Sequence, residues 1–283
     1  MRLPEDVAEA VNVAMGAPPT DAKAVGGGCI NEAARVDTAA GTCFVKWRPG
    51  APPGFFAAEA SGLRALAQSG TVRVPDVLKP PDRHDGALVL SWIEPASSGR
   101  AAMEDAGRHL AQLHSLRGLT PGADADGYIG TLPQGNAPSD DGAWLTFFRE
   151  RRIEALAGAL PSHLRRALEA LPLEQLLSEP EGGCCLLHGD LWSGNIICAD
   201  GGEGWLVDPA VYAGHPEVDL AMTRLFGGFS EAFYGAYQEV AGTLDREWED
   251  RAMLLNLYPL LVHVHLFGGG YISQVEATVR RFQ

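Results

Sequence analysis

The sequence predicts an α+β fold of two lobes, a small antiparallel-sheet lobe followed by a larger and mostly helical one. Runs with the two-residue alternation typical of strands dominate residues 1–93. Later in the chain apolar residues recur at the spacing of helices, as Ala106 and Leu110 do. Residues 94–99 contain Pro, Ser and Gly and favour a linker, so the second lobe is expected to span residues 100–283.

The expected elements of the first lobe follow from these local patterns. Val7 and Val11 share a helical face, and Glu59 lies within a second amphipathic run. Helices are therefore expected at residues 5–15 and 55–68, and strands at 31–38, 42–47, 72–78 and 87–93. The last of these strands is apolar on both faces, which predicts that it is buried.

The second lobe shows long helical patterns with short apolar runs between them. Helices are expected at residues 144–160 and 163–176 and as a pair from residue 249 onward, and short strands near 185–187, 196–197 and 205–207. Polar residues directly follow these short strands, so polar loops are expected in the cleft between the lobes, where ligand sites commonly lie.

Bulk properties limit the classes of function. A net charge of −14 argues against a nucleic-acid-binding role, which requires a basic surface. The N-terminus lacks the apolar core of a signal peptide, and the apolar stretch at residues 253–267 is too short to span a bilayer. The five cysteines show no zinc spacing and favour free thiols in a reducing compartment. We therefore expect a cytoplasmic protein with no nucleic-acid or membrane partner, either a monomer or a homodimer.

The strongest chemical signal is the string from His188 to Asn195, which contains Asp190. Asp190 and Asn195 have the five-residue separation of the protein-kinase catalytic loop, where the carboxylate accepts the proton of the acceptor hydroxyl and the amide binds metal. Asp208 follows an apolar run, where a second magnesium ligand is needed. Each residue alone fits an ordinary turn. Together they predict Asp190 as the base and Asn195 and Asp208 as metal ligands.

A second signal comes from the first lobe. Lys46 alternates with Phe44 on a predicted strand, and Glu59 interrupts the apolar stripe of the following helix. A carboxylate on that stripe is costly to bury without a cation. We therefore expect Lys46 to pair with Glu59 and to bind nucleotide phosphates; the alternative places both side chains in solvent.

A glycine run precedes Lys46. Gly26, Gly27 and Gly28 are expected to cover the phosphates, although glycine runs also form plain hairpin turns. No Gly-Lys-Ser/Thr follows, so this is not a Walker P-loop. Cys29 lies in this loop, where a nearby lysine would lower its pKa, so it is a candidate redox-sensitive thiol, with an inert thiol as the alternative.

Further candidates lie around this loop. Trp192 stands where the acceptor is expected, as a substrate contact or as an anchor of the loop. His215 and Glu217 are weaker substrate candidates, with a helix start as the alternative. His114 and His263 fall in apolar runs and are expected to be packing residues.

These motifs resemble the aminoglycoside-phosphotransferase and protein-kinase-like superfamily, and more closely the fructosamine kinase (ketosamine-3-kinase) family. The resemblance covers nearly the whole chain. It rests on residues 26–31, 44–46, 127–130, 188–195, 208–210, 214–217, 226–229 and 267–271. It implies a bilobal protein-kinase-like fold.

The resemblance also implies a function: ATP- and Mg²⁺-dependent phosphorylation of a sugar hydroxyl, the 3-hydroxyl of a ketosamine such as fructosamine or ribulosamine, with a deglycation role. His188 and Asp219 would support the catalytic loop, and backbone groups from Ile93 and Glu94 onward would contact adenine. Two alternatives remain. One is a kinase of another amine-bearing alcohol, such as an aminoglycoside or choline; the other is a nucleotide-binding pseudokinase.

Overall fold

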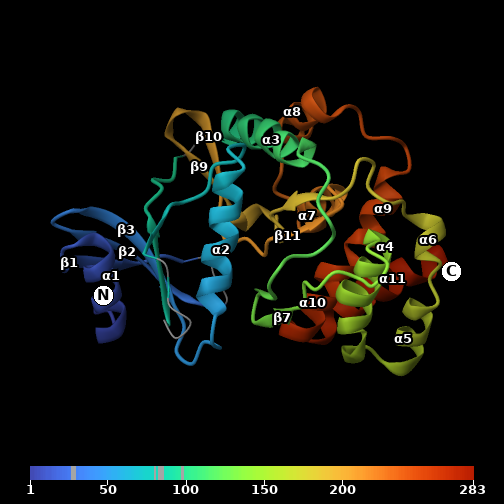
Figure 1. Ribbon diagram of the computed structural model, residues 1–283, viewed down its shortest axis with the longest axis horizontal. Coiled ribbons are helices and arrows are strands. Elements are labelled where there is room, and N and C mark those ends of the chain that lie inside the picture. Colours follow the sequence, from blue (N-terminus) through green and yellow to red (C-terminus); the bar gives the residue numbers. More distant parts are fainter. Residues whose placement is uncertain (27–29, 80, 82–85, 97–98) are drawn as a thin grey trace.

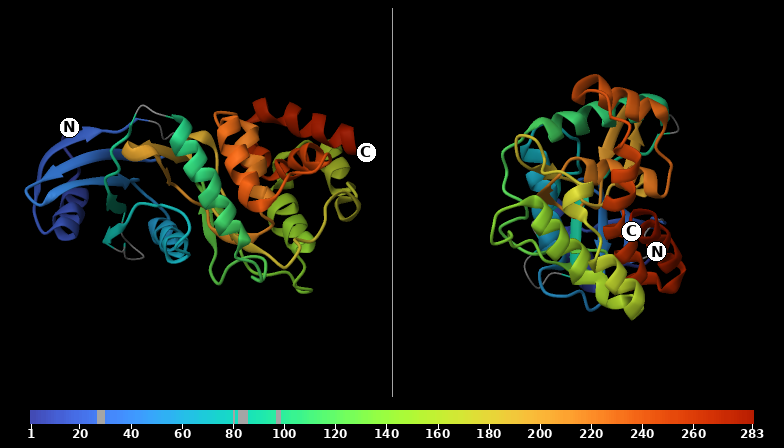
Figure 2. Two further views of the ribbon diagram at one scale, coloured as in Figure 1. Left: turned by 90° about the horizontal axis from the view of Figure 1, so that it is seen from above. Right: turned by 90° about the vertical axis from the view of Figure 1, so that its right-hand side faces the viewer.

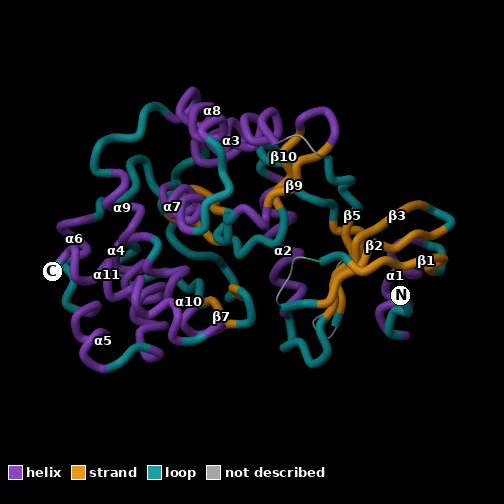
Figure 3. Tube along the Cα trace, turned by 180° about the vertical axis from the view of Figure 1, so that it is seen from behind, coloured by secondary structure: helices purple, strands orange, loops and turns teal. Residues whose placement is uncertain are grey.

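The computed structural model describes residues 1–26, 30–79, 81, 86–96 and 99–283. Strand-rich and helical parts lie at opposite ends of the long axis, and the two termini lie at these two ends (Figures 1 and 2). The strands of the first part gather at one end of the molecule, away from most helices (Figure 3).

The first part is a five-stranded antiparallel sheet with a helix on each face. Its elements are α1 (Glu5–Met15), β1 (Pro19–Ala24), β2 (Glu32–Thr38), β3 (Gly41–Trp47), α2 (Phe55–Gln68), β4 (Val77–Lys79) and β5 (Ala87–Ser91). The strand order is β1-β2-β3-β5-β4. Helices 5–15 and 55–68 are confirmed. The strand expected at 72–78 is reduced to β4, because Pro75 provides no amide hydrogen for a ladder.

Alternation along β3 divides its side chains between two cores. Cys43, Val45 and Trp47 pack on the side of α1, together with Val11. Phe44 packs on the opposite side, in the core that contains the apolar face of α2. Lys46 has the same parity as Phe44 and so faces α2. The β5 strand contributes to both cores and is buried, as expected.

The second part is mostly helical and carries three two-stranded sheets. Its helices are α3 (Gly99–Ser115), α4 (Trp144–Phe147), α5 (Ser162–Glu169), α6 (Leu173–Leu176), α7 (Glu217–Leu225), α8 (Glu231–Ala241), α9 (Trp248–Leu255), α10 (Leu257–Phe267) and α11 (Ile272–Phe282), and its strands are β6 (Gly127–Ile129), β7 (Leu132–Gln134), β8 (Cys185–Leu187), β9 (Ile196–Ala199), β10 (Glu203–Leu206) and β11 (Tyr212–Gly214). The strands pair as β6 with β7, β8 with β11 and β9 with β10. The α3 and α8 helices pack side by side (Figure 1).

Two expected helices are broken. The run at 144–160 is α4, then a π-helix at Phe148–Ile153, then a 3₁₀-helix at Glu154–Ala159. The run at 163–176 separates into α5 and α6, because Pro172 cannot continue a helix. The short strands expected near 185–187, 196–197 and 205–207 are present as β8, β9 and β10, with bounds that differ by at most two residues.

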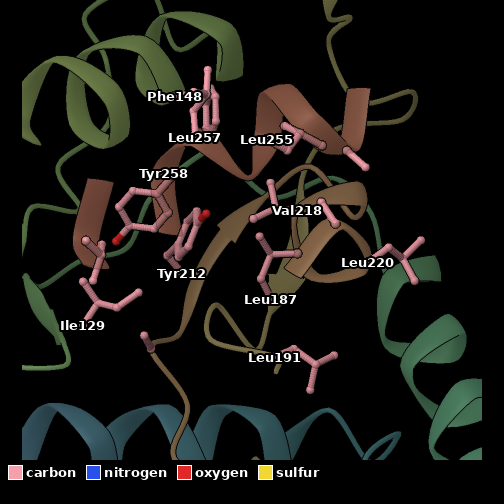
Figure 4. Packing of buried hydrophobic residues seen from close by; sticks show 14 of the residues in the cluster. Ile129, Phe148, Leu187, Leu191, Tyr212, Val218, Leu220, Leu255, Leu257 and Tyr258 are labelled. Carbon is pink, nitrogen blue, oxygen red and sulfur yellow. The ribbon is translucent and has the colours of Figure 1, made fainter. Parts of the chain in front are cut away.

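One continuous cluster of buried side chains joins α2 to the helical part. Figure 4 shows part of it, with Tyr212 of β11, Tyr258 of α10 and Leu191 of the loop after β8. Backbone bonds add to this junction: Leu206 N donates to Arg73 O at 2.8 Å, and Ala96 N donates to Cys198 O at 2.7 Å. Within the described residues, no helix combines the length and apolar character required to cross a bilayer.

Candidate active site

A cavity of about 2000 Å³ lies between the two parts. Its walls come from β3 and α2 on one side and from the 119–138 segment, the loop after β8, residues 207–213 and α10 on the other. Pockets for one drug-sized ligand have roughly 300–1000 Å³. The cavity therefore has room for two such ligands.

The loop after β8 carries Asp190 and Asn195 into this cavity. Asn195 Nδ2 donates to Asp190 O at 2.8 Å and to Asp190 Oδ2 at 3.2 Å. Burial raises the pKa of Asp190 to about 7, with the charges of Asp208 and Asp219 adding to the rise and the Asn195 bond opposing it. A carboxylate with this pKa accepts a proton more readily than an ordinary aspartate.

Asp219 holds this loop from beneath. It is 1% exposed and accepts backbone hydrogen bonds from His188 N at 2.7 Å and Gly189 N at 2.8 Å. Burial raises the pKa of Asp219, but the His114 hydrogen bond and the other donors outweigh burial and keep it below its usual range. His114 bridges Asp219 at 3.3 Å and Tyr237 OH at 3.0 Å, so the packing histidine of the sequence also braces the loop.

His188 ties the loop to the strand that precedes Asp208. Its Nε2 lies 2.9 Å from Val207 O, and its Nδ1 accepts from Asp190 N at 3.3 Å. These two bonds require the neutral ring with the proton on Nε2. Burial lowers the pKa of His188, which agrees with a neutral ring.

Lys46 lies between two carboxylates. Its Nζ is 2.5 Å from Glu59 Oε1 and 2.8 Å from Asp208 Oδ1. The structure thus brings Lys46 and Glu59 together as the sequence predicted, and adds a contact with Asp208. Lys46 is 3% exposed, and burial without these partners would disfavour its charge.

The pKa values of Lys46, Glu59 and Asp208 depend on one another, because the two carboxylates share one ammonium group. Burial lowers the pKa of Lys46, but the two carboxylates outweigh it and raise the pKa above its usual range. For Asp208, Lys46 outweighs burial and lowers the pKa. For Glu59, burial and the charge of Asp208 outweigh Lys46 and raise the pKa to about 7. Of the two carboxylates, Glu59 is the more buried and Asp208 the more open to the cavity.

The groups expected to bind magnesium fit a hard cation. Asn195 Nδ2 also approaches Asp208 O at 3.4 Å, so the two residues are neighbours. The Asp208 side chain is half exposed to the cavity, and Asn195 has its amide nitrogen turned toward Asp190, which leaves the amide oxygen as its ligand atom. Carboxylate and amide oxygens are the ligands that Mg²⁺ prefers. Asp208 adopts φ of 54°, an uncommon conformation for a residue other than glycine.

Gly26, Lys46 and Ile93 line the side of the cavity where a nucleotide is expected from the sequence. Glu94 is absent from the lining, and its carboxylate accepts from Trp92 Nε1 at 2.7 Å instead. Gly27, Gly28 and Cys29 lie outside the described residues, so the expectations for them stay predictions.

The opposite side of the cavity is a group of rings. Trp192 lines it, and its indole covers Gly194 so closely that a side chain there would collide with it. Phe226 meets Trp192 edge-on with ring centroids 6.5 Å apart, and His263 lies 4.8 Å from Phe226. His263 also lies 4.9 Å from Tyr271, so it packs against rings as expected. It does so in the cavity wall, where it is only partly buried, and not in the core.

His215 and Glu217 are not among the cavity-lining residues. The His215 ring packs on Trp144 with centroids 5.0 Å apart, and its Nδ1 accepts from Glu217 N at 3.2 Å. Glu217 forms two bonds of 2.6 and 2.7 Å with Arg251. These contacts match the helix-start alternative, since Glu217 begins α7.

Several residues that line the cavity had no role predicted from the sequence. Tyr128 contacts Phe55 with centroids 5.0 Å apart, and Gly130 lies so close to Ile30 and Leu266 that a side chain there would contact both. The aromatic-glycine runs that contain Phe226 and Tyr271 were the available signal. Periodicity alone does not tell a cavity wall from a core.

Comparison with known proteins agrees with this arrangement. The family model for fructosamine kinase matches residues 4–283. A probable ketoamine kinase of Enterococcus faecium is 38% identical over 265 residues, covering 90% of this chain and 93% of the relative. A chloroplastic protein-ribulosamine 3-kinase of Arabidopsis thaliana is 37% identical over 270 residues, covering 90% and 80%.

Solved structures give the same result. A Thermobifida fusca protein assigned as a fructosamine-3-kinase superposes with a TM-score of 0.82 at 36% identity, covering 97% of each chain. An aminoglycoside phosphotransferase, solved with AMP-PNP and hygromycin B, has a TM-score of 0.65 at 14% identity and covers 98% of each chain, and so shares the fold. By its sequence over nearly its whole length, and by its fold, the chain belongs to the fructosamine kinase family.

Proposed function

We propose that this chain is an ATP-dependent kinase that phosphorylates a sugar hydroxyl of ketosamines, the 3-hydroxyl of a fructosamine or ribulosamine. The observation that carries the proposal is the convergence of Asp190, Asn195, Asp208 and Lys46 on one cavity with room for two ligands. The names of the relatives, ketoamine kinase and protein-ribulosamine 3-kinase, supply the acceptor class.

The two parts of the chain divide the work. Residues 1–93 would form the nucleotide-binding lobe, residues 94–99 the linker, and residues 100–283 the lobe that binds the acceptor. Gly26 and the backbone near Ile93 line the side where the nucleotide would bind, and Trp192 lines the other. A nucleotide bound on the first side would have Lys46 and Asp190 between it and the other side.

Each polar residue has one task. Asp190 accepts the proton of the acceptor hydroxyl as the new O–P bond forms and the bond from the γ-phosphorus to the ADP oxygen breaks, and its raised pKa suits this transfer. Lys46, held by Glu59, binds a phosphate oxygen. Asn195 and Asp208 would hold Mg²⁺, which when bound supplies positive charge against the phosphate oxygens. Asp219 and His188 keep the loop in place.

The rings of the opposite wall suit the rest of the acceptor. An indole face packs on the C–H surface of a sugar and attracts an amine cation, and a ketosamine carries both. Phosphorylation would destabilise such an adduct and release the amine, which is a repair reaction. The described cysteines Cys43, Cys184, Cys185 and Cys198 are free thiols, as in a cytoplasmic enzyme.

The proposal is tested by turnover with a panel of acceptors. The purified chain is incubated with ATP, with and without Mg²⁺, and with an N-alkyl fructosamine, an N-alkyl ribulosamine, choline or an aminoglycoside. ADP release and ³¹P NMR of the product are measured. We expect Mg²⁺-dependent turnover of a ketosamine with the phosphate on its 3-hydroxyl. Faster turnover of choline or an aminoglycoside would replace the ketosamine assignment, and no turnover of any acceptor would favour a pseudokinase.

A further inference from the structure

Arg152 is a fully buried cation without a carboxylate partner among the described residues. It is 0% exposed, and it lies in the π-helix Phe148–Ile153. Arg149 and Arg251 are partly buried, and each lies within 3 Å of a glutamate, whereas Arg152 has backbone and amide oxygens instead. Burying an unpaired charge is costly, so its surroundings must compensate for this cost.

Three aromatic rings and two short hydrogen bonds provide this compensation. The Arg152 guanidinium carbon lies 4.0 Å from the centre of the Tyr212 ring, 4.6 Å from that of Phe147 and 5.3 Å from that of Tyr258. Such contacts are strong when water is excluded. The guanidinium donates to Gly135 O and to Asn136 Oδ1, both at 2.7 Å. Only the planar guanidinium group, with its two terminal nitrogens in a fixed geometry, can donate to both partners at once.

The hydrogen-bonded partners of Arg152 organise one wall of the cavity. Asn136 O accepts from Ala123 N at 2.9 Å, Asn136 N donates to Asp126 Oδ1 at 2.8 Å, and its Nδ2 donates to Ala125 O at 3.1 Å. Asn136 therefore uses both backbone and side-chain groups to shape the segment 122–136. Much of the cavity wall comes from that segment.

The ring partners of Arg152 lead to the catalytic loop. Tyr212 lines the cavity and lies four residues after Asp208. A Cβ on Gly189 would lie 3.5 Å from the Tyr212 ring, so Tyr212 packs directly beneath the residue before Asp190. Tyr258 accepts from Gln134 Nε2 at 2.9 Å, and Gln134 also lines the cavity. Figure 4 shows Tyr212 and Tyr258 as neighbours in the buried cluster, close to Ile129.

We infer that Arg152 is a positioning residue that fixes the acceptor-side wall, residues 122–136, relative to the catalytic loop. The inference rests on the proposed function, since it assigns this wall to the acceptor. Arg152 does not line the cavity; it acts through Asn136 on the wall and through Tyr212 on the loop. Its loss would misplace the acceptor while leaving the nucleotide side intact.

The experiment compares Arg152→Lys with Arg149→Lys in the same π-helix. Arg149 donates to Glu174 Oε1 at 2.8 Å and to Leu171 O at 3.0 Å, and none of these residues lines the cavity. Both substitutions keep the positive charge and remove the planar guanidinium group. We expect Arg152→Lys to raise the KM for the ketosamine about tenfold or more, since small displacements near a reacting group have large kinetic effects. The KM for ATP should stay within about twofold in both variants.

A second measurement does not depend on turnover. Hydrogen–deuterium exchange of the amides in residues 122–136 should be faster in Arg152→Lys than in Arg149→Lys. If Arg152→Lys does not fold, Phe147→Leu, which removes one ring from the cation, takes its place and should change both readouts in the same direction.

The outcomes separate the two claims. Suppose that wild type turns over a ketosamine, and that Arg152→Lys has the same acceptor KM and the same hydrogen–deuterium exchange as wild type. This result would overturn the positioning role and leave the proposed function standing. A lower kcat with both KM values unchanged would show a structural role only, and would also overturn it. No ketosamine turnover by the wild type would overturn the proposed function and the acceptor-side role together, even where exchange confirms that Arg152 holds the wall.

Discussion

The Lys46 ammonium lies 2.8 Å from the Asp208 carboxylate, although the two residues are 162 positions apart in the sequence. This contact joins β3 of the sheet to the segment that follows β10, across the cavity. A cation bound to the Asp208 carboxylate and a phosphate bound to the Lys46 ammonium would lie next to each other at this ion pair. Under the proposed function, this contact would therefore mark the position of the terminal phosphate and its metal.

Asp208→Asn tests the metal ligand. The variant keeps the shape of the side chain and leaves Glu59 as the partner of Lys46, so the fold should be retained. Loss of the charge that binds Mg²⁺ should lower kcat/KM at least about a hundredfold, as for other electrostatic groups at a reaction centre. Steady-state kinetics over a range of Mg²⁺ concentrations measures this. Asp200→Asn, an exposed carboxylate of the β9–β10 connection, is the control, and equal kinetics for the two variants would contradict the assignment.

Asp219→Asn tests the brace of the catalytic loop. The two carboxylate oxygens of Asp219 accept hydrogen bonds from His188 N and Gly189 N. The side-chain amide of Asn has only one oxygen, so its NH₂ group would face one of these N–H donors. An unsatisfied buried donor costs about 1–3 kcal/mol of the free energy of unfolding. Urea denaturation measures the change, which should be accompanied by a lower kcat. Asp250→Asn, which removes an exposed pair with Arg281, should cost less than about 1 kcal/mol. Wild-type stability of Asp219→Asn would count against the brace.

Gly189→Ala tests the backbone of the loop. Gly189 has φ of 81°, and a Cβ there would collide with Ala210 O. Strain and collision together should cost roughly 2–5 kcal/mol and displace Asp190. In α8, Gly235→Ala meets no atom within 4 Å and should stabilise the protein by up to about 1 kcal/mol. Thermal denaturation compares the two, and a Gly189→Ala protein as stable and active as wild type would refute this account of the loop.

The buried ring of His215 should make the free energy of unfolding depend on pH. Burial lowers its pKa from 6.5 to about 3 in the folded protein. Between these values the unfolded chain binds a proton that the folded chain does not, so stability present above pH 6.5 is lost on acidification. At pH 5 the loss attributable to His215 is at most about 2 kcal/mol.

His215→Phe keeps a ring against Trp144 and should show a smaller loss of unfolding free energy between pH 7 and pH 5 than wild type. Denaturation at the two pH values measures the difference, with the exposed His163→Phe as control. The kinetics of His215→Phe should match wild type, because the ring does not line the cavity. A raised acceptor KM would restore His215 as a substrate contact.

The features that were predictable from the sequence are those fixed by local pattern. Alternation along 42–47 determines which face of β3 carries Lys46, and the apolar stripe of 55–68 isolates Glu59, so their pairing follows from two local periodicities. The bounds of α2 agree for the same reason. The string from His188 to Asn195 places Asp190 and Asn195 in one loop, and the structure brings Asp208 beside them.

The features that were not predictable depend on contacts distant in sequence. The helix expected at 144–160 changes to π and 3₁₀ geometry around Arg152, whose ring partners come from β11 and α10 as well as from α4. A charged residue in an amphipathic run favours an exposed position, and only the tertiary structure buries it. His263 shows the reverse case: its apolar neighbours indicate a core, yet the helix turns this position toward the cavity.

Comparison of wild type with Asp190→Ala in a ketosamine phosphorylation assay tests the central claim most directly. With Mg²⁺ and ATP, we predict that wild type releases ADP and forms a ketosamine 3-phosphate. The rate for Asp190→Ala should be at least about a hundredfold lower, since general base catalysis contributes roughly 10²–10⁴-fold. Circular dichroism verifies that the variant is folded. Equal rates for the two proteins would contradict the assignment of the catalytic base. Absence of any product from wild type would contradict the proposed reaction itself.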